Sequence, residues 1–136
     1  MHYIKLLMTA LVVFFVLDML WLGFIAKNMY TTAYEPWLRL DPKGNLQPLW
    51  WAAMIVYALF VIAILIFVYP LADGSLLKGL MYGALLGLVT YGIYDFTLLA
   101  VFKNIPIRMA FVDWAWGTTL CALSSMSVVY VGRLSI

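Results

Sequence analysis

Three aspartates lie inside long apolar stretches of the sequence. They are Asp18, Asp95 and Asp113, half of the chain's six acidic residues. An ionised aspartate at the centre of a membrane-spanning helix costs about 2.5–3.5 kcal/mol. Carboxyls in such positions must therefore be protonated, paired, hydrated or bound to a cation. An ionisable residue inside a span is by default a candidate for function.

Aromatic residues accompany all three acids. Tryptophans follow two of them at the spacing Asp-x-x-Trp, which puts acid and indole one turn apart on the same helix face. Two tyrosines, Tyr91 and Tyr94, precede Asp95. Because aromatic rings attract organic cations, these side chains and the carboxyls could together form a cation site. The expected ligand- or ion-binding residues are Asp18, Asp95, Asp113, Tyr91, Tyr94, Trp21 and Trp116, and the sequence indicates no catalytic residue.

The composition indicates that these residues are carried by membrane helices. Of the 136 residues, 67% are hydrophobic and 10% are charged, and the mean hydropathy is +1.04. A soluble domain carries about 25% charged residues, so this chain has too few to cover a surface that faces water. Its partner is the lipid bilayer. The net charge of +2 is too small for a nucleic-acid footprint, which excludes nucleic acid as a partner.

Four segments are apolar and long enough to cross a bilayer, which takes roughly 20 residues of helix. They cover about residues 6–26, 49–69, 79–102 and 109–131, and they make residues 1–136 one transmembrane domain. We expect an all-α fold: an integral membrane four-helix bundle with antiparallel up-down topology. Both termini then lie on one side, the terminal side. The loops after the first and third segments lie on the other, the loop side.

This topology brings the three acids to a similar depth. Asp18 lies eight residues before the loop-side end of its segment, Asp95 lies seven before, and Asp113 lies about four after the start of the last. A rise of 1.5 Å per residue puts them roughly 12, 10 and 6 Å below the same face. We therefore expect three helices to deliver carboxyls to one layer. Five Lys and Arg on the loop side against three on the other favour a cytoplasmic loop side without fixing the orientation.

Each acid also has a structural explanation. Asp113 is shallow enough for a salt bridge to Arg108 or Lys103. Asp95 could bond to a neighbouring tyrosine or to an asparagine nearer the interface. Asp18 has no polar neighbour on its own helix, so its partner must come from another one.

Small residues predict close helix packing. Gly79, Gly83 and Gly87 recur every four residues on the third segment, and Gly117 shares the face of Asp113 on the fourth. Such a face lets another backbone approach closely. It could pack within the bundle, against a second copy in a homodimer, or against another membrane protein.

The loop after the first segment predicts a short helix at the membrane interface. Thr32 and Glu35 have the spacing of a capping box, and Pro36 then falls in the first helical turn. This helix would serve as an aromatic anchor or as a lid. With Trp50 and Trp51, Trp37 fits an interfacial belt better than a ligand cage. The residues expected at the interface are Tyr30, Tyr34, Trp37, Leu38 and Leu40.

The sequence offers little for a metal or redox cofactor. A single cysteine, Cys121, and a single histidine, His2, exclude a thiolate or imidazole zinc site and a bis-histidine haem within one chain. We expect no cofactor. A hard divalent cation at Asp18, Asp95 and Asp113 stays open, because Mg²⁺ and Ca²⁺ prefer oxygen ligands.

Two stretches resemble a known family. YGIYDFTLLAVFKNIPIRMAFVDWAWGTTLCA, at residues 91–122, and DMLWLG, at residues 18–23, are similar to the bacterial integral membrane proteins of domain of unknown function 2177. The resemblance spans essentially the whole chain. It implies a multi-pass protein of the cell inner (plasma) membrane and brings no established activity. The matching residues are Tyr94, Asp95, Thr97, Val112, Asp113, Trp116 and Gly117, whereas Leu98 and Ile105 stand where the family usually has Asn and Trp.

Three classes of function follow. The leading hypothesis is binding or transport of protons or of a cationic or polar small molecule at the three carboxyls. The second is a membrane enzyme acting on lipid or isoprenoid substrates. The sequence shows no nucleophile with an adjacent base, which argues against this class. The third is an accessory or assembly subunit of a membrane complex, docked through the glycine face.

Overall fold

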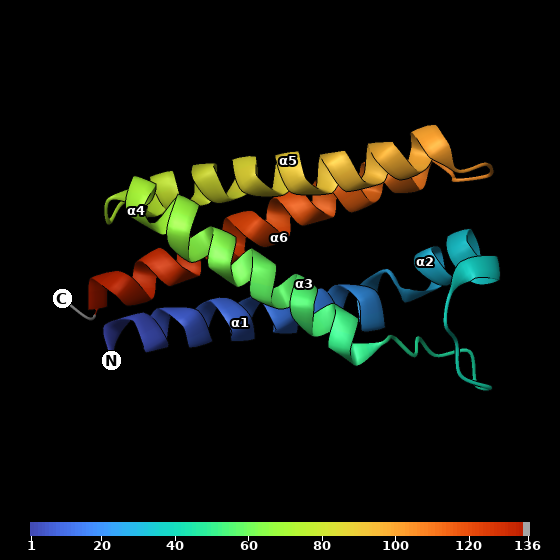
Figure 1. Ribbon diagram of the computed structural model, residues 1–136, viewed down its shortest axis with the longest axis horizontal. Coiled ribbons are helices and arrows are strands. Elements are labelled where there is room, and N and C mark those ends of the chain that lie inside the picture. The colour runs from blue at the N-terminus through green and yellow to red at the C-terminus, as the bar shows by residue number, and fades with distance from the viewer. Residues whose placement is uncertain (135–136) are drawn as a thin grey trace.

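The regular secondary structure of the chain is helical. A computed structural model describes residues 1–134, and Figure 1 shows its helices in order along the chain. Two π-helical turns and one 3₁₀ turn are labelled η. The elements are α1 (His2–Leu20), η1 (Trp21–Ile25), α2 (Lys27–Tyr34), η2 (Glu35–Trp37), α3 (Trp50–Ala63), η3 (Ile64–Val68), α4 (Tyr69–Ala72), α5 (Leu76–Val101) and α6 (Ile107–Leu134).

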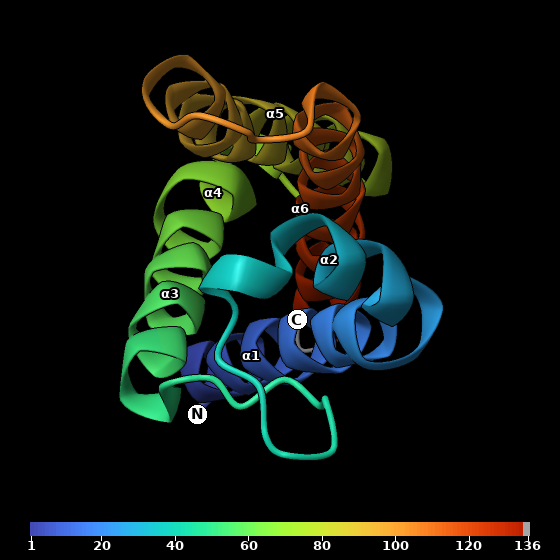
Figure 2. The same ribbon diagram turned by 90° about the vertical axis from the view of Figure 1, so that its right-hand side faces the viewer.

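Residues 1–134 form four long helical segments, of which that containing α3 runs obliquely to the others: α1 with η1, α3 with η3 and α4, α5, and α6. The N-terminus and the end of α6 lie at one end of the molecule, and α2 lies at the other (Figures 1 and 2). Three segments are long and apolar enough to cross a membrane, namely His2–Ile25, Trp50–Ala72 and Leu76–Val101. The fourth, α6, is more polar because its buried face carries serine and glycine. Of the four spans expected from the sequence, three are therefore candidate spans within residues 1–134, and the fourth is the long helix α6.

The second segment is longer than the sequence predicts. The helix continues through Pro70 to Ala72 instead of turning at the proline. Proline lacks the N–H that would bond to the carbonyl four residues earlier, and the π-helical turn η3 directly precedes it. The helix then ends at Asp73 and Gly74, both in the left-handed conformation.

The glycine face of α5 packs against α6 within the molecule. A Cβ at Gly79 would meet Val129, one at Gly83 would meet Ser125, and one at Gly87 would meet the backbone of Gly117. The two helices are therefore in close backbone contact, as a small-xxx-small face allows. A second copy or another protein that used this face would have to displace α6.

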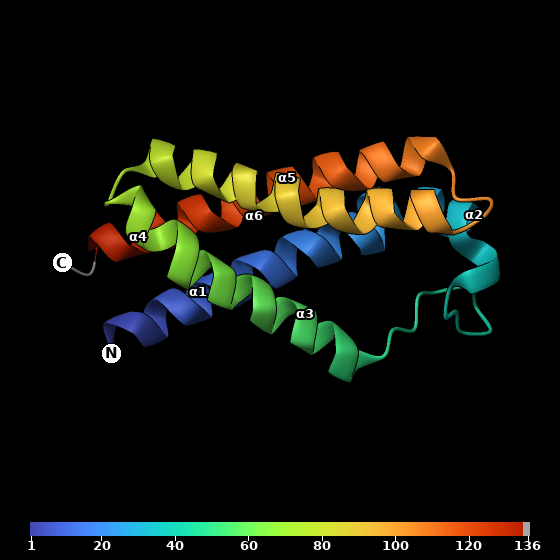
Figure 3. The same cartoon turned by 45° about the horizontal axis from the view of Figure 1, so that its top comes forward.

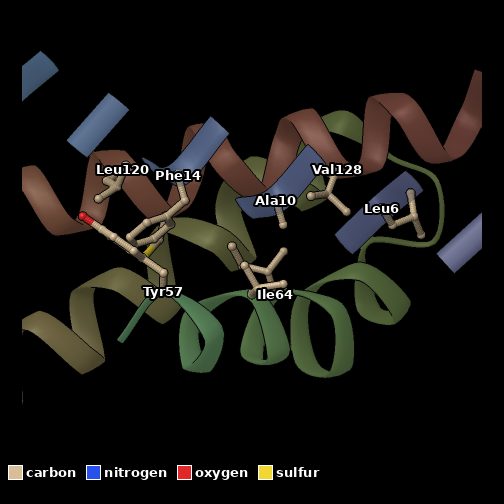
Figure 4. Close-up of a cluster of buried hydrophobic side chains, with 9 residues drawn as sticks. Leu6, Ala10, Phe14, Tyr57, Ile64, Leu120 and Val128 are labelled. Atoms are coloured by element: carbon tan, nitrogen blue, oxygen red, sulfur yellow. The ribbon is translucent and has the colours of Figure 1, made fainter. Parts of the chain in front are cut away.

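Side chains from α1, α3 and α6 form the main hydrophobic core. Figure 4 shows Phe14 of α1 beside Tyr57 of α3 and Leu120 of α6. The ring of Phe14 stacks on Phe60 with centroids 4.8 Å apart. These contacts fix the position of α3 against α1, although α3 crosses the other helices obliquely (Figure 3). The buried cluster is Leu6, Ala10, Phe14, Tyr57, Val61, Ile64, Leu120, Cys121 and Val128.

The short helix of the first loop begins earlier than predicted. It runs from Lys27 to Tyr34, so the expected capping residue Thr32 lies inside it, and that cap assignment is wrong. The helix is instead preceded by Ala26, which makes no side-chain cap. Pro36 lies at the start of the 3₁₀ turn η2, where a backbone N–H would have no partner within the helix, so its absence costs nothing.

The packing of α5 on α6 predicts a strong position dependence for glycine substitutions. Gly87→Ala would press a methyl group into the backbone of Gly117, and we expect a loss of about 1–3 kcal/mol in the free energy of unfolding. A Cβ at Gly23 meets nothing within 4 Å, so Gly23→Ala serves as the control. Unfolding in detergent micelles measures both variants, and equal stabilities would contradict this packing.

Candidate functional site

The acids of α5 and α6 form a pair. Asp95 is 3% exposed, and its carboxyl meets that of Asp113 at hydrogen-bonding distance. Two carboxylates cannot bond to each other, so such a pair holds either a shared proton or a bound cation. The second oxygen of Asp95, Oδ2, is buried and has no hydrogen-bond partner among residues 1–134.

The register of α5 on α6 creates this pair. Gly79 lies opposite Val129 and Gly83 lies opposite Ser125, so each step of four residues along α5 matches a step of four back along α6. The same register places Tyr91 over Gly117. One further turn sets Asp95 against Asp113.

Asp113 is also bonded to the first-loop helix. The hydroxyl of Tyr30, on α2, donates to Oδ1 of Asp113, and the indole Nε1 of Trp21 donates to the oxygen of Tyr30 at 3.1 Å. Burial beside Asp113 raises the pKa of Tyr30 far above its ordinary value, so the phenol stays protonated and can donate. The partner of Asp113 is thus a tyrosine and not one of the expected cations.

Asp18 receives its hydrogen bonds from two other helices. Tyr57 of α3 donates to Oδ2 at 3.0 Å, and the indole of Trp116 on α6 donates to Oδ1 at 3.3 Å. Trp116 in turn stacks on Trp21, with ring centroids 4.5 Å apart and planes 7° from parallel. The carboxyl of Asp18 therefore joins α1, α3 and α6 near the acid pair.

A cavity of about 420 Å³ lies between the first-loop helix and the α5–α6 pair. Asp113 is its only acidic lining residue among those described, and tyrosines from α2 and α5 line the cavity with it, one of which, Tyr30, donates to its carboxyl. Trp37, expected in an interfacial belt, belongs to the wall. The cavity is lined by Tyr30, Tyr34, Trp37, Leu38, Tyr94, Leu98, Phe102, Ile105 and Asp113.

The structure distributes the sequence-predicted site residues over three places. Asp113 and Tyr94 line the cavity, and Asp95 lies directly behind Asp113. Asp18, Trp21 and Trp116 form the neighbouring hydrogen-bonded and stacked group. Tyr91 covers Gly117 and lies outside the cavity lining.

Several lining residues were not among the predicted site residues. Tyr30 and Tyr34 were expected at the interface, and their four-residue spacing on one helix face is the signal that could have indicated a shared target. Leu98 and Ile105, where the sequence departs from the family pattern, also face the cavity. Among the described residues, no three His, Cys, Asp or Glu side chains lie close enough to hold a metal ion together.

Comparison with known proteins gives a family and no activity. A family model described as "Predicted membrane protein (DUF2177)" matches residues 3–130. Neither the curated proteins nor the solved structures contain a match to the chain. The matched range includes Asp18, Asp95 and Asp113 and all the residues that line the cavity.

The bond from Tyr57 to Asp18 predicts a stability effect. Tyr57→Phe leaves an oxygen of a buried carboxyl without its donor, so we expect a loss of about 1–3 kcal/mol in the free energy of unfolding. Tyr130→Phe removes the same hydroxyl from an exposed tyrosine of α6 and is the matched control. Denaturation in micelles provides the measurement. If both variants unfold at the same denaturant concentration as the native protein, the bond does not hold α3 to α1.

The cavity wall predicts a decrease in stability at alkaline pH. Burial, together with the charges of Asp113 and Asp95, raises the pKa of Tyr34 to about 12, whereas a tyrosine in an unfolded chain titrates near 10. Because the folded-state pKa is the higher one, this contribution is intact below pH 10 and is lost as the pH rises toward 12. Unfolding measured across that interval should show a falling free energy, with a smaller slope in Tyr34→Phe. Tyr3→Phe, at an exposed position, should keep the native slope, and an unchanged slope in Tyr34→Phe would refute the assignment.

Proposed function

Since the chain belongs to the family of predicted membrane proteins DUF2177, and a carboxyl lines its cavity, we propose that it binds a small organic cation there. Asp113 is the counter-ion, and the ligand occupies the loop-side end of the molecule. In this proposal all four long segments cross the inner membrane as an antiparallel bundle, and α2 lies at the interface.

The acid pair is the observation that carries the proposal. Asp95 is almost wholly buried, yet its Oδ2 lacks a donor among the described residues. Buried polar atoms in folded proteins are nearly always hydrogen-bonded, so an orphaned carboxyl oxygen indicates an unfilled requirement for positive charge or a proton. A cation beside Asp113 supplies that charge.

The lining favours an organic cation over a metal ion. A hard divalent ion takes six or more oxygen ligands, whereas the described cavity lining offers the carboxyl of Asp113, with that of Asp95 behind it, and a few phenols. Tyr30, Tyr34 and Tyr94 instead line the same cavity as the carboxyl, and aromatic faces attract an ammonium group. The site therefore has the chemistry of an aromatic cage with one fixed negative charge.

Binding and proton release are linked in this arrangement. Without ligand, Asp95 and Asp113 share a proton, and Tyr30 donates to Asp113. An ammonium ion that pairs with Asp113 makes the shared proton unnecessary and displaces it. Alternate exposure of the same pair to the two sides of the membrane would turn this exchange into transport of the cation against protons.

Titration with tetramethylammonium in lipid nanodiscs tests the proposal. Asp113→Asn removes the counter-ion, and we expect its affinity to be at least about tenfold lower than that of the native protein. Asp73→Asn, which neutralises a carboxylate in the turn at the terminal side, should bind as the native protein does. In weak buffer, a pH dye should report proton release from the native protein on binding and much less from Asp95→Asn.

Two results would overturn the proposal. Equal affinities of the native protein and Asp113→Asn would show that the carboxyl is not the counter-ion. Binding without any proton release would remove the exchange. In liposomes loaded with the dye, cation-driven pH changes that are the same for the native protein and for Asp95→Asn and Asp113→Asn would exclude transport.

A further inference from the structure

We propose that the cation bound here is the head group of a single-chain amphiphile, such as a long-chain amine, and that it enters the cavity sideways from the membrane. The proposal rests on the function proposed above and specifies its ligand class. It follows from which side of the cavity is walled and which side is exposed.

One stripe of α5 both lines the cavity and faces outward. Tyr94 and Leu98 are one turn apart on α5 and therefore lie along one face of the helix, and Phe102 directly follows its last residue. Tyr94 and Phe102 are each 59% exposed. Tyr94 lies seven residues, or about 10 Å, from the loop-side end of α5, which is within the hydrocarbon core of a bilayer. The cavity is thus continuous with a surface that faces lipid.

Within residues 1–134, no further helix contributes to this side of the cavity. The segment containing α3 packs on α5 mainly through η3 and α4, at the terminal side, and through the ring of Phe60, which lies 5.6 Å from that of Tyr91. Toward the loop side α3 diverges from α5, as Figures 1 and 2 show from two directions. Among the described residues, the cavity lining includes none from α1 or α3.

The side toward water is covered instead. Tyr30 and Tyr34 of α2 and Trp37 of η2 contribute to the wall, and α2 lies across the loop-side end of the molecule (Figure 2). The hydroxyl of Tyr30 holds α2 to Asp113. A ligand from water would have to displace this helix, whereas a ligand in the bilayer meets the open stripe of α5.

The lining also divides by chemistry in the way an amphiphile requires. The carboxyl of Asp113 and the phenols around it form a polar end suited to an ammonium group. The remaining wall is apolar and is formed by Leu98, Phe102 and Ile105 with Trp37 and Leu38. A compact cation fills only the polar end, while an alkyl chain lies along the apolar wall and continues into lipid.

Two probes in lipid nanodiscs separate the head group from the chain. Tetramethylammonium reports the polar end alone, and decyltrimethylammonium adds a chain. Empty nanodiscs give the partitioning of the second probe, so that its affinity is expressed per concentration in the bilayer. We expect native protein to bind both probes and Asp113→Asn to lose at least about tenfold for each.

Leu98→Trp tests the sideways path because it fills the middle of the α5 stripe. We expect it to weaken decyltrimethylammonium binding at least about tenfold and to leave tetramethylammonium binding within about twofold. Ile93→Trp places the same bulk on α5 at an exposed position outside the cavity lining, and it should change neither affinity. Unfolding midpoints of both variants establish that they are folded.

The outcomes distinguish the two proposals. If Leu98→Trp binds decyltrimethylammonium as the native protein does, or loses both probes equally, the amphiphile proposal is wrong while Asp113-dependent binding of tetramethylammonium stands. If Asp113→Asn binds both probes as the native protein does, the function proposed above is wrong and the amphiphile proposal falls with it.

Discussion

A carboxyl that is held away from water must receive hydrogen bonds or positive charge, and this requirement organises the loop-side half of the molecule. Asp18 meets it with donors from α3 and α6, so three helices converge on one side chain. Asp113 meets it with Tyr30, which brings the first-loop helix onto α6. Asp95 keeps a buried oxygen that has no hydrogen-bond partner among the described residues, and its neighbour Asp113 lines the cavity.

The sequence predicts the parts of this arrangement that depend on local composition and spacing. Apolar length locates the long helices to within a few residues, and the four-residue repeat from Gly79 to Gly87 predicts a close helix contact. The sequence does not predict which acids contact each other, because the depth of a residue along its helix does not determine which neighbouring helix its side chain faces. The similar depths suggested one layer of three carboxyls. The register of α5 on α6 instead pairs Asp95 with Asp113, and Asp18 is bonded to Tyr57 and Trp116.

The loop residues show a second limit. Local spacing assigned Thr32 to a helix cap, but α2 begins at Lys27 and runs through it. The position of α2 is set by tertiary contacts, above all the bond from Tyr30 to Asp113 across 83 residues of sequence. A cavity wall that forms through contacts between residues far apart in the sequence is not predicted by local residue spacing. For this reason Tyr34 and Trp37 were assigned to the membrane interface and not to a binding site.

The polar character of α6 bears on how the protein is made. A helix with serine and glycine along one face partitions into lipid less readily than its three apolar companions. If α6 crosses the membrane as proposed, its short connection to α5 and the backbone contact at Gly87 would allow the two helices to insert as one hairpin, with the polar face already covered. Assembly of the helices would then be completed only after α6 is synthesised, because Asp18 lacks one of its two hydrogen-bond donors until Trp116 has emerged from the ribosome.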